Sequence, residues 1–261
     1  MKSYLGIDAA WSENQPSALA VIDENEHLQG LYRSYEEVVG SIKKEGVKPK
    51  GSYPDFDKIF SYFKNQKMDI ENIAVDMPVH PTDTGRRRGC DNQIASVFGK
   101  YGAATHSPNG KYPGDLGVKI HDQWKDLGYV WETLRQPKRK RVFFETYPHA
   151  AIIRYLKLDY RLAYKVSKMH AYWKTEIKEE RKKRLIRNLN KLYDYCAGRI
   201  KGVEDHMDRL DEQSSYYLWQ LKTVEDRLDA MICALVSLDH AKGRTQGYGD
   251  QEGAVWVPES H

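Results

Sequence analysis

The sequence predicts an α/β protein in which a mixed β-sheet is flanked by helices. Three short apolar runs near the N-terminus are separated by only a few turn-forming residues, which is typical of an antiparallel meander. Two later apolar runs are separated by long segments, which is typical of strands joined by helices. The expected strands are 4–8, 17–22, 27–32, 73–79 and 141–145.

The remaining elements follow from periodicity and from breaker residues. Aromatic and aliphatic side chains recur at helical spacing at about 56–63 and predict a helix. The segment at about 82–136 is rich in glycine, proline, asparagine and arginine, so we expect short helices and irregular structure there. A short helix is expected at about 150–156, and the tail at 249–258 ends in a strand-like piece.

Length and pattern together suggest one domain. A chain of 261 residues can bury one good core. We therefore expect a single domain over residues 1–261 with two insertions, at about 82–136 and, as a charged helical insertion, at about 162–221. A strongly apolar helix is expected after the second insertion, at about 223–238.

The composition excludes several classes of protein. No run of about 18 apolar residues is present, so no membrane span is expected. The N-terminus lacks the pattern of a signal peptide, and the cytoplasm is the expected location. Cys90, Cys196 and Cys233 are far apart and form no CxxC pair, which argues against a disulfide scaffold or a thiolate zinc site. The net charge of +4 permits nucleic-acid binding without requiring it.

Two aspartates stand at unusual places in predicted strands. Asp8 closes the first apolar run, and Asp76 lies inside the fourth. An ionised carboxylate in an apolar setting costs several kcal/mol unless it is paired or binds a metal. Either residue alone is more often a turn or capping residue. Because both belong to central strands, we interpret them together as candidates for one acidic site.

The last predicted helix adds further carboxylates. Asp226 and Asp229 share a stripe that differs from the apolar face of this helix. Thr223 is a natural N-cap, so Asp226 has an alternative role in a capping box, whereas Asp229 has none. Glu145 ends the strand at 141–145 and is a further candidate as a ligand, a general base or a partner of a ligand.

Carboxylates that converge from two strands and a helix favour divalent metal chemistry. They repel one another until cations neutralise them. Mg²⁺ prefers a few carboxylates together with waters and phosphate oxygens. Two such ions about 3.5–4 Å apart activate the attacking water and stabilise the leaving oxygen in phosphodiester hydrolysis. The sequence therefore predicts a catalytic acidic site with Mg²⁺ or Mn²⁺ as cofactor. Its catalytic candidates are Asp8, Asp76, Glu145, Asp226 and Asp229.

Seven short motifs stand along the chain: Gly6-Ile7-Asp8-Ala9-Ala10-Trp11, Val75-Asp76-Met77-Pro78, Gly85 to Asp91, His106-Ser107-Pro108-Asn109, Glu145-Thr146-Tyr147-Pro148, Asp226 to Ala230 and Gly249 to Pro258. Together they resemble the DUF429 family, whose members are described as predicted nucleases with a ribonuclease H-like fold. The resemblance covers most of the chain and is weakest across 162–221. It implies a ribonuclease H-like mixed sheet and metal ligation by Asp8, Asp76, Asp226 and Asp229. One departure is the absence of a convincing Glu on the first helix, where ribonuclease H itself has one.

Basic residues supply candidates for substrate contacts. Arg86 and Arg87 are suited to bidentate phosphate contacts, although a structural ion pair with Asp91 is an equal alternative. His106 is a further candidate for a substrate contact, although a hydrogen-bonded loop histidine is the favoured alternative, and Lys165 is a weaker candidate for a phosphate contact. The expected partner is a nucleic acid, with DNA and RNA not distinguished.

Two other functions remain to be weighed against a nuclease. A non-catalytic nucleic-acid-binding protein would keep the fold, and its basic runs would contact phosphates. A phosphotransferase of the sugar kinase or actin type is disfavoured, because it needs two such domains and glycine-rich phosphate loops. This chain has Ala9-Ala10-Trp11 where such a loop would stand.

Overall fold

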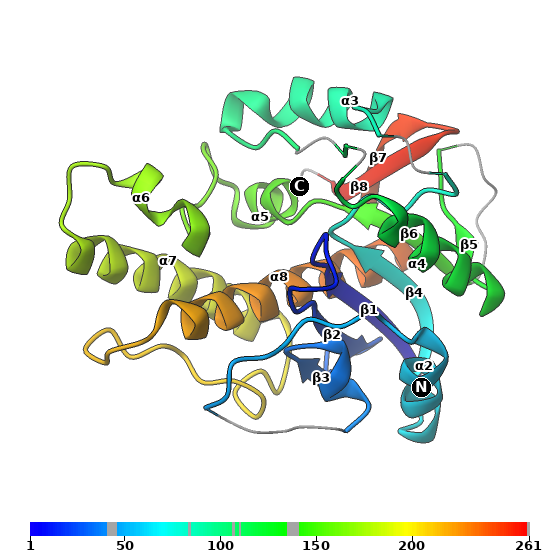
Figure 1. Ribbon diagram of the computed structural model, residues 1–261, viewed down its shortest axis with the longest axis horizontal. Helices are drawn as coiled ribbons and strands as arrows, with labels where there is room; N and C mark the ends of the chain where they lie inside the picture. Colours follow the sequence, from blue (N-terminus) through cyan, green and yellow to red (C-terminus); the bar gives the residue numbers. More distant parts are fainter. Residues whose placement is uncertain (41–45, 83–84, 106–107, 110, 135–140, 260–261) are drawn as a thin grey trace.

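A computed structural model describes residues 1–40, 46–82, 85–105, 108–109, 111–134 and 141–259 (Figure 1). Its strands are β1 (Lys2–Asp8), β2 (Ala18–Asp23), β3 (Leu28–Tyr32), β4 (Asp69–Val75), β5 (Val130–Trp131), β6 (Val142–Thr146), β7 (Thr245–Asp250) and β8 (Gly253–Pro258). Its α-helices are α1 (Tyr35–Val38), α2 (Phe56–Asn65), α3 (Gly89–Phe98), α4 (Asp115–Asp126), α5 (Pro148–Leu156), α6 (Met169–Tyr172), α7 (Lys178–Arg199) and α8 (Leu218–Ala241). Two 3-10 turns are η1 (Gly99–Tyr101) and η2 (Val166–Lys168).

The strands form one mixed sheet. Their order is β3-β2-β1-β4-β6-β8-β7, and β5 pairs with β6 beside this path. The meander β1–β3 is antiparallel, as predicted, whereas β4, β6 and β8 continue parallel to β1. Parallel strands end at the same edge of a sheet, so the carboxyl ends of these four strands lie together. The mixed α/β class predicted from the sequence is confirmed.

Helices cover both faces of the sheet. Successive side chains of a strand point to opposite faces, so neighbouring residues contact different helices. Tyr4, Ala74 and Phe144 belong to the core cluster that includes α5, α7 and α8. Leu5 and Phe143, their chain neighbours, belong to the cluster that includes α2 and α4. Figure 1 shows α8 running along one face of the sheet, with α7 outside it. The central strands are therefore buried on both faces.

Helix α8 lies very close to β1 because Gly6 has no side chain. A Cβ at this position would stand 2.2 Å from the carbonyl oxygen of Ala230 and 2.1 Å from the backbone nitrogen of Ala234. Only glycine permits such an approach of two backbones. The contact fixes α8 against the strand that ends in Asp8.

Several boundaries differ from the sequence-based predictions. The strand predicted at 73–79 begins at Asp69 and ends at Val75, so Asp76 follows the strand instead of lying inside it. The predicted helical insertion holds α6 and the long α7, but residues 200–217 are not helical. The strand-like piece predicted at the end of the tail is confirmed as β8, and it forms a hairpin with β7, which was not predicted. Within the described residues, no helix is long and apolar enough to cross a membrane.

Candidate functional site

Asp8 and Asp76 come together at the carboxyl edge of the sheet. Asp8 is the last residue of β1, and Asp76 directly follows β4. The parallel pairing of these strands sets Ile7 opposite Val75, and the backbone N–H of Asp76 donates to the carbonyl of Ile7 at 2.9 Å. The two strand-end carboxylates predicted from the sequence therefore sit on adjacent strands.

Helix α8 brings three further carboxylates to the same place. The helix begins at Leu218, so Thr223 lies inside it, where its hydroxyl donates to the carbonyl of Trp219 at 2.9 Å. The capping-box alternative for Asp226 is therefore wrong. Asp226 is 6% exposed, and Asp229 is fully buried. Glu225, which the sequence reasoning did not consider, is also buried beside them.

Two lysines supply the positive charge inside this cluster. The ammonium of Lys165 lies 2.5 Å from Asp229 Oδ2 and 3.5 Å from Glu225 Oε1. Lys222 lies 2.8 Å from Glu225 Oε1 and also forms an ion pair with Asp226. We name Asp8, Asp76, Glu225, Asp226 and Asp229 with these two lysines the acidic cluster. Lys165 was expected to contact a substrate, and in this structure its ammonium binds carboxylates.

Neutral and backbone donors complete the cluster. The hydroxyl of Tyr164 donates to Asp229 Oδ1 at 2.7 Å, and the backbone N–H of Val166 donates to Glu225 Oε2 at 2.6 Å. The segment that runs from Tyr164 into η2 is thus attached to α8 through the carboxylates of Asp229 and Glu225. A buried carboxylate with several donors is held in one orientation.

Burial and mutual repulsion make these carboxylates reluctant to ionise. Burial, together with the nearby Asp226, raises the pKa of Asp8 to about 7. Burial is also the main cause that raises the pKa of Asp229 to about 6, against the opposing effect of Lys165. The pKa of Asp76 is raised well above its ordinary value by burial and by Asp8. Such shifts are common where function needs a site to attract cations or protons.

The donor chemistry of the cluster fits a hard divalent cation, although the side chains are not gathered around one point. All five acidic members offer carboxylate oxygens, which Mg²⁺ and Mn²⁺ prefer. Among the residues that the structure describes, no group of three or more His, Cys, Asp or Glu side chains is close enough to hold a metal ion. Instead the ammonium groups of Lys165 and Lys222 form ion pairs with these carboxylates.

Glu145 lines one cavity together with Asp76, but it pairs with Arg88 instead of with the acidic cluster. It follows Phe144 in β6, so the pleat directs its side chain away from the face that carries α8. Its two oxygens accept hydrogen bonds of 2.7 Å from the guanidinium of Arg88, and Oε1 also accepts from the backbone N–H of Val79 at 3.0 Å. Arg88 also pairs with the buried Asp91. Glu145 thus connects β6, the segment after β4 and the start of α3.

The arginines predicted to contact substrate lie near this ion network. Arg87 donates from Nε to Asn92 Oδ1 at 2.6 Å and from Nη2 to the carbonyl of Asp91 at 2.9 Å. Arg86 and Arg87 line a surface cavity that is separate from the acidic cluster. The carboxylate of Asp91 is paired with Arg88, so the alternative that assigned it to Arg86 or Arg87 is wrong. His106 lies outside the described residues.

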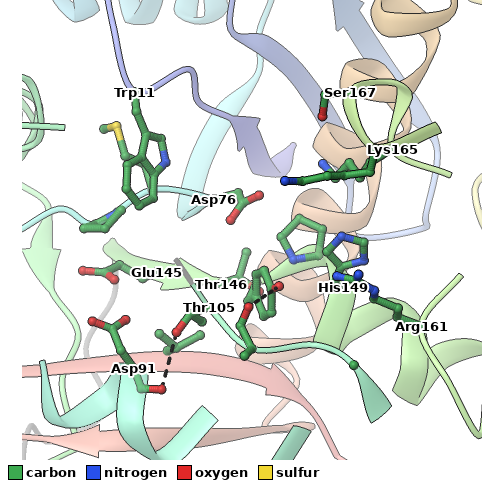
Figure 2. A pocket seen from close by; sticks show the side chains of 18 of the residues that line it. Trp11, Asp76, Asp91, Thr105, Glu145, Thr146, His149, Arg161, Lys165 and Ser167 are labelled. Atoms are coloured by element: carbon green, nitrogen blue, oxygen red, sulfur yellow. Dashed lines mark hydrogen bonds between the residues drawn. The ribbon is translucent and has the colours of Figure 1, made fainter. Parts of the chain in front are cut away.

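Two cavities open beside the acidic cluster and share Trp11, Asp76, Ser167 and Lys222 in their walls. The first, of about 560 Å³, extends towards His149 and Arg161 and is shown in Figure 2. The second, of about 820 Å³, is lined by Asp8 and Asp226. Both cavities therefore give a ligand access to the carboxylates.

Comparison with known proteins assigns a family to the chain. A family model described as "Protein of unknown function (DUF429)" matches residues 6–253. The chain belongs to the DUF429 family. No curated protein and no solved structure matches it. The DUF429 match spans all the carboxylates of the acidic cluster, and the resemblance seen in the sequence motifs is confirmed.

Sequence reasoning about this DUF429 protein missed three charged residues, Glu225, Lys222 and Arg88. Lys222 and Asp226 are four residues apart on α8, a spacing that joins opposite charges on a helix face. This signal becomes visible only once the helix is known to begin before residue 223. Arg88 is buried through long-range contacts with β6, for which the local sequence contains no signal.

Proposed function

We propose that this DUF429 protein is a nuclease that hydrolyses phosphodiester bonds of nucleic acid with Mg²⁺ or Mn²⁺ as cofactor. The observation that carries the proposal is the convergence of Asp8 and Asp76, from two strand ends, with Asp226 and Asp229 of α8. Burying four carboxylates together is costly unless cations compensate them. A site of this kind is better suited to a reaction that uses divalent ions than to a purely structural role.

We also propose that the sheet is a ribonuclease H-like core. Support comes from the antiparallel meander β1–β3, followed by β4 and β6 added parallel to β1 on its other side. The proposed site lies at the carboxyl ends of parallel strands, which is where open α/β sheets usually bind ligands.

In the proposed reaction, Asp8, Asp76, Asp226 and Asp229 hold the cations. The bound ions would activate water and stabilise the leaving oxygen. Lys165 and Lys222 form ion pairs with the carboxylates, and with cations bound their ammonium groups would be available for substrate phosphates. Tyr164 keeps Asp229 oriented through its hydroxyl.

Metal binding tests this proposal directly. Mn²⁺ is titrated into the purified protein by calorimetry, and the wild type is compared with Asp8→Asn and Asp226→Asn. Asp239→Asn is the matched control, because Asp239 is a buried carboxylate of the same helix that pairs instead with Arg244 and Tyr155. We expect saturable binding that is lost in the two cluster variants and kept in the control.

A second step tests the reaction. Fluorescently labelled single-stranded and duplex DNA and RNA are incubated with Mn²⁺, and cleavage is read on denaturing gels. Asp8→Asn should abolish cleavage that the Asp239→Asn control retains. If all folded variants bind Mn²⁺ as the wild type does, or if none of the substrates is cut, the proposal is wrong.

The second candidate is a non-catalytic nucleic-acid-binding protein. The observation in its favour is that Lys165 and Lys222 already compensate the carboxylates. It predicts nucleic-acid binding that weakens steeply with salt, needs no divalent ion and is unchanged in Asp8→Asn.

A further inference from the structure

The smaller cavity beside the acidic cluster has the size of a pocket for one small ligand. Its volume of about 560 Å³ lies within the range of about 300–1,000 Å³ that is usual for small-molecule sites. A nucleic-acid duplex is too wide to enter such a space. A single nucleotide that is not paired with another strand can enter it, as in enzymes that take one base out of the stack.

Arg161 gives one wall of this cavity a charge that suits an anion. Its Nε is buried and, within the described part of the chain, has no hydrogen-bond partner. Its guanidinium lies over the ring of Tyr172 at 5.7 Å, and none of the ion pairs found among the described residues includes it. Arg88, which also lines the cavity, is by contrast paired with two carboxylates. A half-buried guanidinium without a carboxylate partner is ready to bind phosphate through its fork of donors.

Two further features make this end of the cavity favourable to phosphate. Lys168 lines the cavity, is exposed, and forms no ion pair with another described residue. Pro148 and His149, in the first turn of α5, also line it. The N-terminal turn of a helix carries partial positive charge and favours anions. The positive charge therefore comes from three separate segments.

The opposite end of the cavity offers an apolar surface. Figure 2 shows the indole of Trp11 on one side of Asp76, and Lys165, His149 and Arg161 on the other. Met77 and Pro78 line the same cavity next to Asp76. An aromatic ring is a sequence-tolerant surface on which a base stacks. A ligand that spans the cavity thus meets an aromatic ring, the acidic cluster and a cationic wall.

We propose that this cavity binds one unpaired nucleotide, with its phosphate on Arg161 and Lys168 and its base against Trp11. The protein then acts on single-stranded nucleic acid or on an unpaired end. That the bound nucleotide is a substrate rests on the nuclease function proposed above. The binding it describes does not need a metal ion, so the two proposals fail separately.

The test is calorimetric titration of adenosine 5′-monophosphate into the protein in EDTA. Adenosine and ribose 5-phosphate are titrated in parallel, because they carry the base and the phosphate separately. The variants are Arg161→Gln, Lys168→Gln and Trp11→Leu. Arg141→Gln is the matched control, since Arg141 also lies over a tyrosine ring, that of Tyr129 at 6.0 Å, and does not line the cavity. Circular dichroism establishes which variants are folded.

We expect the wild type to bind the nucleotide more tightly than either fragment. Arg161→Gln should weaken nucleotide binding by about tenfold or more, the usual scale of a charged hydrogen bond, and Lys168→Gln should weaken it less. Adenosine binding should fall only in Trp11→Leu. If Arg161→Gln does not fold, Lys168→Gln still tests the cavity, because Lys168 is exposed and its replacement should leave the fold intact.

Three results would overturn the inference. The first is the absence of saturable nucleotide binding at millimolar concentrations, and the second is equal affinity for the nucleotide and for either fragment. The third is nucleotide binding that none of the folded cavity variants changes relative to Arg141→Gln. Loss of Mn²⁺ binding in Asp8→Asn with nucleotide binding in EDTA intact supports both proposals independently. Nucleotide binding without any Mn²⁺ binding supports the cavity and refutes the metal site.

Discussion

Replacing Glu145 by Gln removes the charge at the centre of a buried ion network. The side chains of Arg88, Asp91 and Glu145 are 8%, 2% and 3% exposed, so water screens their charges little. Removing one partner of a buried ion pair typically costs about 3–5 kcal/mol, because the other charge remains buried without compensation. Gln keeps the shape and one oxygen for Val79, and Asp91 still faces Arg88. We therefore expect a loss of about 3 kcal/mol in the free energy of unfolding.

Urea unfolding followed by circular dichroism measures this loss. Asp69→Asn is the control, because Asp69 pairs with Arg141 at 2.7 Å, with side chains that are 60% and 50% exposed. An exposed pair of this kind contributes only about 0–1 kcal/mol. Arg88→Met and the double variant with Glu145→Gln complete a double-mutant cycle, in which we expect a coupling of about 2 kcal/mol.

A loss in Glu145→Gln no greater than in Asp69→Asn would refute the reasoning, because the network would then contribute no more than a surface pair. The same variant also tests the role that the sequence suggested for Glu145. A folded Glu145→Gln protein that binds Mn²⁺ as the wild type does supports a structural role. One that has lost Mn²⁺ binding would place Glu145 in the metal site.

Two further changes test the packing and the charge of the site. Gly6→Ala should destabilise the protein by about 3 kcal/mol or more, because the new Cβ meets the backbone of Ala230 and Ala234, which cannot rotate away. Thermal unfolding measures this loss of stability, and a variant that melts at the wild-type temperature would contradict the prediction. Lys222→Met should strengthen Mn²⁺ binding roughly tenfold, because an ammonium that competes with the metal for carboxylates is removed. Unchanged or weaker binding in calorimetry would show that Lys222 does not compete with the ion.

The sequence was sufficient to predict the mixed sheet and its N-terminal meander. The runs that become β1, β2 and β3 are short, apolar and separated by turn-forming residues, so local signals dominate. The resemblance of the motifs to DUF429 was confirmed by the family match over residues 6–253. The structure also brings together Asp8 and Asp76, which the sequence grouped as one candidate site, since both stand where adjacent parallel strands end.

The orientation of Glu145 was not predictable from the sequence. A strand that is buried on both faces shows no alternation of polar and apolar residues, and Val142, Phe143 and Phe144 are all apolar. Without alternation, the face to which the next carboxylate points cannot be read. The same limitation concealed its partner Arg88, which reaches β6 from a point 57 residues earlier in the chain.

The start of α8 was misplaced for a different reason. Thr223 has the properties of an N-cap, and Asp226 completes a plausible capping box three residues later. In the structure the helix continues upstream to Leu218, and the side chain of Gln220 accepts a hydrogen bond from the backbone N–H of Tyr217 there. Local propensity is a weak guide when tertiary packing extends a helix.

The contact between Gly6 and α8 limits how the acidic site can adapt to an ion. Asp8 is two residues from Gly6, and Asp226 is one helical turn from Ala230, so backbones in mutual contact carry both carboxylates. These backbones cannot separate or approach when an ion arrives, and the fit has to come from side-chain rotation and movement of the lysines. For the metal site proposed above, a backbone frame of fixed spacing would favour the compact octahedral shell of Mg²⁺ or Mn²⁺ over the larger and more variable shell of Ca²⁺.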